Sequence, residues 1–190
     1  MQKIPTLFVR DPHVRRQVLR EVRPGCGWVT RGEGRATVMW SGLCVMLDDN
    51  GEWWTRRRVA AGKTPPAKFQ LVHHNERTRK SIGWEPSAQC SYAKTLAEAI
   101  DATDGTYQAG TYDLCGPHLN NNADGFGAHV LMKHGWSPLS ARMALEESPR
   151  DFDGLRSWLP HFPYKGIVWH HPDGRMAKLK ARDVRHVGPA

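Results

Sequence analysis

Residues 35–59 read RATVMWSGLCVMLDDNGEWWTRRRV, and this stretch decides the fold class. An apolar strand pattern runs to Leu47 and is interrupted once, at Ser41. The next four residues, DDNG at 48–51, are a strong turn signal, and the strand pattern returns over 52–59. The stretch therefore predicts an antiparallel hairpin whose first strand is broken near its middle.

The rest of the chain repeats this extended pattern and adds two short helices. The expected segments are a loop at 60–69, a strand at 81–85, a helix at 93–100, a strand at 110–115, a loop at 120–127, a helix at 152–159, and a closing hairpin made of 164–170 and 175–180. The second helix is expected to be capped by Asp153 or Asp151. Strands dominate, so the sequence predicts an α+β fold of antiparallel sheets with few flanking helices.

The composition indicates an ordinary folded protein with an excess of positive charge. The chain has 190 residues, 39% of them hydrophobic and 24% charged, which excludes disorder as the main state and suits a single domain. No apolar run is long enough to span a bilayer or to act as a secretion signal, so we expect a cytoplasmic protein without a membrane partner. The formal charge of +8 favours ligands that carry phosphate.

Four segments resemble, in order and spacing, the motifs of the phage-type RNA ligase family, which belongs to the covalent nucleotidyltransferase superfamily. They are RATVMWSG at 35–42, RRRVAAGKTPP at 56–66, GTYDLCGP at 110–117 and YKGIVWHHPDGRMAKLK at 164–180. The resemblance implies a nucleotidyltransferase domain of the RNA and DNA ligase type over 1–190, without the superfamily's C-terminal accessory domain. It also implies that the chain binds ATP or a related nucleotide.

The first motif departs from the family at its catalytic position. The family has K-x-D-G, in which the lysine attacks the α-phosphate of ATP, and the matching residues here are Met39, Trp40, Ser41 and Gly42. A thioether cannot form a phosphoramidate, so the ordinary lysyl-AMP cannot form at position 39. The resemblance still places Ser41 at the nucleotide. Trp40 either stacks on the base or packs in the core.

In two further motifs, the residue here differs from a glutamate of the family. Asp113 stands where the family has a glutamate, and the resemblance gives it a catalytic role or a contact with the ribose or the acceptor. Lys165 replaces the glutamate that precedes Gly166 in the family. This lysine either supplies the positive charge of the missing metal or acts as the nucleophile.

The closing motif keeps both of the family's lysines. Lys178 and Lys180 are two residues apart in an expected strand, so both point to one face, where the resemblance implies that they hold the phosphates of the nucleotide. The resemblance also places Arg56 beside the nucleotide. Because Lys165 repels cations, we expect weak or absent Mg²⁺ binding. The sequence has no C-x-x-C or H-E-x-x-H motif, so we expect no zinc site.

These residues leave three functions open. We favour an enzyme that carries out altered nucleotidyl-transfer or ligase-type chemistry on a nucleotide, with a small molecule or RNA as the acceptor. The alternative is a pseudo-ligase that binds nucleotide or RNA without turnover, because the nucleophile of the first motif is missing. A third, weaker interpretation is a structural module that binds nucleic acid through its basic surface.

Overall fold

The structure is a computed structural model that describes residues 3–14, 16–104 and 106–184. The chain divides into two compact units: unit 1 comprises Met1–Lys3 and Ser41–His134, and unit 2 comprises Ile4–Trp40 and Gly135–Ala190. Apart from the junction of Lys3 and Ile4, the chain passes from one unit to the other between Trp40 and Ser41 and between His134 and Gly135. The first of these passages lies inside the MWSG segment, at the break that the sequence predicts in the first strand.

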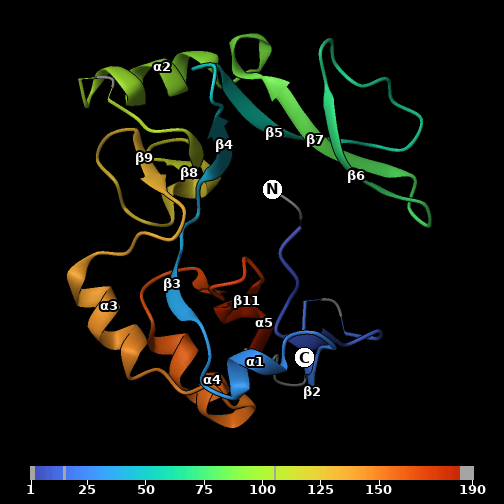
Figure 1. The fold of residues 1–190 in the computed structure, drawn as a ribbon, viewed down its shortest axis with the longest axis vertical. Helices are drawn as coiled ribbons and strands as arrows, with labels where there is room; N and C mark the ends of the chain where they lie inside the picture. The colour runs from blue at the N-terminus through green and yellow to red at the C-terminus, as the bar shows by residue number, and fades with distance from the viewer. Residues whose placement is uncertain (1–2, 15, 105, 185–190) are drawn as a thin grey trace. The chain divides into compact units, whose positions relative to one another are not determined.

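Unit 1 is built on a six-stranded antiparallel sheet with the strand order β6-β7-β5-β4-β8-β9 (Figure 1). Its elements are β4 (Leu43–Leu47), β5 (Trp53–Val59), β6 (Gln70–Asn75), β7 (Lys80–Pro86), β8 (Gly110–Cys115), β9 (Val130–Lys133), α2 (Ala93–Asp101) and the short 3₁₀ turns η1 (Ser87–Gln89) and η2 (Asn120–Asn122). One face of β4 and β8 packs on α2, where Val45, Leu114 and Ala99 are fully buried. The opposite face of these strands carries Cys44, Met46, Thr111 and Asp113, and we call it the polar face for its carboxylate and hydroxyl.

Unit 2 is built on a three-stranded antiparallel sheet with the order β11-β10-β3. Its elements are β1 (Phe8–Arg10), β2 (Val18–Val22), α1 (Gly27–Thr30), β3 (Arg35–Met39), α3 (Leu139–Glu146), α4 (Phe152–Trp158), η3 (Leu159–His161), β10 (Gly166–His170), β11 (Met176–Lys180) and α5 (Ala181–Val184) (Figure 1). Ile167, Trp169 and Leu179 are fully buried. The outer edge of β11 is covered, because Lys178 exchanges backbone hydrogen bonds with Pro5 and Leu7.

The expected α+β class with antiparallel sheets and few helices is confirmed. β10 and β11 form the predicted closing hairpin. The predicted first hairpin forms only from Leu43 on, between β4 and β5, because residues 35–39 form β3, which pairs with β10 in the other sheet. The turn of the first hairpin depends on Asp48, whose Oδ1 accepts backbone hydrogen bonds from Asn50 and Glu52. Of the two expected caps of α4, the structure selects Asp151, which accepts a hydrogen bond from the Gly154 backbone.

The remaining expectations are met in part. α2, β7 and β8 lie where the sequence predicts a helix and two strands, whereas η2 puts a helical turn into the loop expected at 120–127. The sequence did not predict β1, β2, β6, β9, α1, α3 and α5. No helix in the described part of the chain is long and apolar enough to cross a membrane. A single domain of the ligase type over 1–190 stays a prediction.

Candidate functional site

Three lysines gather at one end of the sheet of unit 2, and we call Lys165, Lys178 and Lys180 the lysine cluster. Met39 of β3 lies opposite Gly166 of β10, which lies opposite Lys180 of β11. Lys165 immediately precedes Gly166 in the chain. Residues opposite each other in antiparallel strands point to the same face, so Met39, Gly166 and Lys180 form one row across β3, β10 and β11.

The alternation of β11 gives two of the lysines a common face. Ala177 and Leu179 have fully buried side chains, whereas Lys178 and Lys180 are only half-buried. The sequence predicts this alternation, and the structure agrees with it.

Gly166 allows β10 and β11 to approach closely beside the cluster. A Cβ atom at this position would lie 2.2 Å from the carbonyl oxygen of Leu179 and 2.7 Å from Cα of Lys180. Just beyond, the backbone N–H of Ala181 donates to the carbonyl of Lys165 over 3.1 Å. The absence of a side chain at position 166 therefore places the backbones of Lys165 and Lys180 side by side.

The lysine cluster is crowded with like charge. The pKa of Lys180 is lowered from 10.5 to about 8, first by burial and then by the positive charges of Arg182, Lys178 and Lys165. Asp183 opposes this effect only in part. Its buried carboxylate already accepts hydrogen bonds from Arg10, at 3.3 Å to each oxygen. The nearest negative charge is thus shared with another cation.

Met39 and Trp40 are buried beside the cluster. Met39 is 9% exposed and Trp40 is 5% exposed. The Trp40 ring contacts Tyr164 edge to face at 5.2 Å and stacks nearly parallel to Trp136 at 6.2 Å. Its carbonyl oxygen accepts a hydrogen bond from Nζ of Lys165 over 3.3 Å. This placement agrees with the packing role of Trp40 rather than with an open platform for a base.

In unit 1 the predicted residues Asp113 and Arg56 lie on the polar face of the sheet. Asp113 lies directly opposite Cys44, and Met46, on the same face as Cys44, lies opposite Trp54. Arg56 follows Trp54 by two residues and therefore shares this face. Its guanidinium lies over the ring of Trp84, 5.8 Å from the centroid.

Asp113 and Cys44 on this face have close polar or charged neighbours. Oδ2 of Asp113 lies 3.1 Å from Nε2 of His134, whose Nδ1 lies 2.8 Å from the hydroxyl of Thr111. The pKa of the Cys44 thiol is raised to about 12, first by burial and then by the charge of Asp113, while Arg56 acts in the opposite direction. Cys44 is consequently a neutral packing group at physiological pH.

Ser41 is held by its backbone rather than by its hydroxyl. Its N–H donates to Oδ2 of Asp124 over 2.6 Å, and its carbonyl accepts from Nδ2 of Asn120 over 2.5 Å. Next to it, a Cβ on Gly42 would lie 2.7 Å from Cβ of Asp113, which explains the glycine there. The composition of 120–127 predicts only a loop and gives no sign of these anchors.

The predicted site residues thus divide between the units: Met39, Trp40, Lys165, Lys178 and Lys180 belong to unit 2, and Ser41, Arg56 and Asp113 belong to unit 1. Within the described ranges no three His, Cys, Asp or Glu side chains are grouped so that they could hold a metal ion. A search against models of known protein families and against curated proteins finds no match for this chain.

Proposed function

We propose that the chain is a divergent, RNA-ligase-like nucleotidyltransferase that binds ATP or a related nucleotide through its phosphates at the lysine cluster. The supporting observation is the crowding of Lys165, Lys178 and Lys180 around a carboxylate that Arg10 already engages. A polyphosphate would supply the negative charge that the protein lacks there and would offset the repulsion among the lysines. Fixed ammonium groups would do this without Mg²⁺.

The pKa of Lys180 supports altered nucleotidyl transfer as the reaction. At a pKa of about 8, a substantial fraction of this side chain is a neutral amine near pH 8, and only the neutral form has a lone pair for attack. In the proposed step the amine bonds to the α-phosphorus, the bond to the pyrophosphate oxygen breaks, and the amine releases a proton to water. Pyrophosphate leaves, and the nucleotidyl group then passes to a small molecule or an RNA end.

Lys165 remains the other candidate nucleophile. Its ammonium donates to the carbonyl of Trp40, so in this arrangement it is better placed to hold a phosphate than to attack one. In the proposed mechanism Lys165 and Lys178 neutralise the β- and γ-phosphates and the leaving pyrophosphate.

The second candidate function is a pseudo-ligase that binds nucleotide or RNA without turnover. Met39 favours it, because this buried thioether is paired into the sheet at the position where the family carries its nucleophile. A pseudo-ligase retains binding at the lysine cluster but forms no covalent product. The two functions therefore share a ligand and differ in one chemical step.

Incubation of the full chain with α-labelled ATP, followed by acid quenching and peptide mass spectrometry, separates these functions. A nucleotidyl group on Lys180 or Lys165 establishes transfer, and saturable ATP binding without label establishes the pseudo-ligase. Lys178→Gln with Lys180→Gln should weaken ATP binding about a hundredfold, and Lys94→Gln, at an exposed position of α2, should leave it unchanged. ATP binding that is absent, or equal in both variants, contradicts the proposal.

A further inference from the structure

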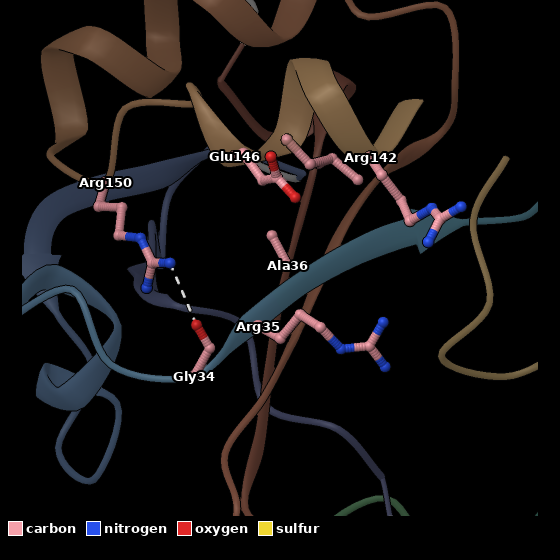
Figure 2. A pocket seen from close by; sticks show the side chains of 7 residues that line it. Gly34, Arg35, Ala36, Arg142, Glu146 and Arg150 are labelled. Atoms are coloured by element: carbon pink, nitrogen blue, oxygen red, sulfur yellow. Dashed lines mark hydrogen bonds between the residues drawn. The ribbon is translucent and has the colours of Figure 1, made fainter. Parts of the chain in front are cut away.

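A second basic site lies in unit 2, between the start of β3 and the end of α3. A cavity of about 280 Å³ opens there, lined by Gly34, Arg35, Ala36, Arg142, Leu145, Glu146 and Arg150. Figure 2 shows that Arg142 and Glu146 reach the cavity from α3, whereas Arg35 and Ala36 belong to β3. None of these residues belongs to the lysine cluster.

The charge that lines this cavity is unbalanced. Three arginines and one glutamate line it, and in the described part of the chain none of the four forms an ion pair within 4 Å. Arginine stays protonated in proteins, so the cavity keeps an excess positive charge at any physiological pH. The arrangement therefore favours a ligand with more than one negative charge.

Arg150 is a fixed part of the wall. Its guanidinium donates to the carbonyls of Glu33 at 2.6 Å, Gly34 at 3.1 Å and Val29 at 3.4 Å. All three acceptors are neutral backbone groups, so they hold the side chain in place without cancelling its charge. Figure 2 shows the Arg150 side chain pointing toward Gly34 at the end of the cavity.

Arg35 and Arg142 retain donors for a ligand. Arg35 uses one Nη2 hydrogen bond, to the carbonyl of Gly135 at 3.1 Å, and the Arg142 side chain has no hydrogen-bond partner among the described residues. Each guanidinium has five N–H donors in a planar fork that matches two phosphate oxygens. Both side chains are exposed, so a ligand can reach them without opening the core.

We propose that this cavity binds a phosphate monoester, with Arg35 and Arg142 as the donors and Arg150 as a fixed positive charge. A monoester carries a charge of about −1.5 to −2 at neutral pH, which matches three arginines opposed by one glutamate better than the single charge of a phosphodiester does. The volume lies at about the lower limit of small-molecule sites, so a phosphate and the group attached to it fill it. The 5′-phosphate of an RNA strand and that of a free mononucleotide both have this chemistry.

The test compares ligands that differ only in the terminal phosphate. Fluorescence anisotropy with a short single-stranded RNA labelled at its 3′ end should show about tenfold tighter binding of the 5′-phosphate form than of the 5′-hydroxyl form. Calorimetry with AMP and adenosine makes the same comparison for a free nucleotide. A preference in the RNA pair alone assigns the strand end, and a preference in the AMP pair assigns the mononucleotide.

Measurement in a variant with Lys178→Gln and Lys180→Gln separates this site from the lysine cluster, because the phosphate preference should persist there even if the proposed function fails. Arg142→Gln should abolish the preference, and Arg23→Gln, at an exposed position of the same unit, should keep it. Glu146→Gln should strengthen the preference several-fold by removing the carboxylate, a gain that a purely structural role cannot produce. Equal binding within both ligand pairs, or a preference that survives Arg142→Gln, overturns the proposal.

Discussion

The polar face of unit 1 and the lysine cluster of unit 2 differ in which charged groups lie beside each other. In unit 1, Asp113 lies against His134, and the nearby thiol of Cys44 is neutral. In unit 2, Lys178 and Lys180 repel each other, and Asp183 is shared with Arg10. The polar face places its carboxylate beside an imidazole, whereas the cluster gathers three lysines near a carboxylate that Arg10 already engages. This difference identifies the cluster as the stronger candidate for binding phosphate.

Both arrangements arise from the same feature of antiparallel sheets. Opposite residues share a face, so Cys44 meets Asp113 in one sheet, and Gly166 meets Lys180 in the other. The polar face carries both a positive and a negative side chain, Arg56 and Asp113, whereas the cluster consists only of lysines. Close approach of the strands therefore brings unlike groups together in the first arrangement and like charges together in the second.

The largest effect should come from separating the strands that bring the lysines together. Gly166→Ala puts a Cβ 2.2 Å from the carbonyl of Leu179, a backbone atom that cannot move aside alone. We expect the free energy of unfolding to fall by more than about 3 kcal/mol, because β10 and β11 must shift apart. Urea denaturation followed by tryptophan fluorescence measures this change.

Gly127→Ala is the matched control, because no atom lies within 4 Å of its Cβ position and its backbone is not left-handed. Its effect should stay within about 0.5 kcal/mol. If both variants unfold at the same urea concentration, close approach at Gly166 does not hold the cluster together.

The hairpins could be predicted because their signals are local. The DDNG turn, the interruption at Ser41 and the helical spacing over 93–100 each fix one element from a few neighbouring residues. β6 and β9 could not be predicted in this way. β6 is mostly exposed at the sheet edge, and the four residues of β9 lack alternation, so only pairing with β7 and β8 makes them strands.

For the candidate site, too, only the features encoded by neighbouring residues could be predicted from the sequence. The common face of Lys178 and Lys180 follows from strand alternation alone. The partners that tune the site are far away in sequence: Asp183 reaches Arg10, and Ser41 is held by Asp124. No local pattern encodes such contacts, because they depend on how separate segments pack.

The second-largest effect on stability should come from removing one of the charges that repel each other in the lysine cluster. The pKa of Lys180 is about 8 in the folded protein and 10.5 ordinarily, so burying its charge lowers stability at pH 7. Lys180→Met roughly keeps the volume and removes the charge. Because the side chain is only half-buried and solvent screens its charge, we expect the unfolding free energy to rise by roughly 2 kcal/mol at pH 7, less than the full pKa shift would give. Between pH 8 and 10.5 the unfolded chain binds more protons, so the wild type gains stability and the difference disappears. Urea denaturation across this pH range measures the convergence.

Lys94→Met, on the exposed side of α2, provides the control, and its difference from the wild type should not change with pH in this way. A saturating polyphosphate should reverse the order of stability, because only the wild-type cluster binds it with full charge. A constant difference between wild type and Lys180→Met from pH 7 to 10.5 would show that repulsion is not what separates the two regions.

The smallest effect on stability should come from a substitution on the polar face. Asp113→Asn removes the carboxylate beside His134, a partly exposed pair, so we expect a loss of about 1 kcal/mol in urea denaturation at pH 6 and almost none for Asp49→Asn in the exposed turn. The variant also lowers the pKa of Cys44, but burial is the larger cause of its rise to about 12, so alkylation of this thiol at pH 8 should remain slow. Rapid labelling of Cys44 in peptide mass spectra would mean that Asp113, rather than burial, keeps the thiol protonated. The state of this thiol would then depend on a single charge, whereas that of Lys180 depends on burial and on several like charges.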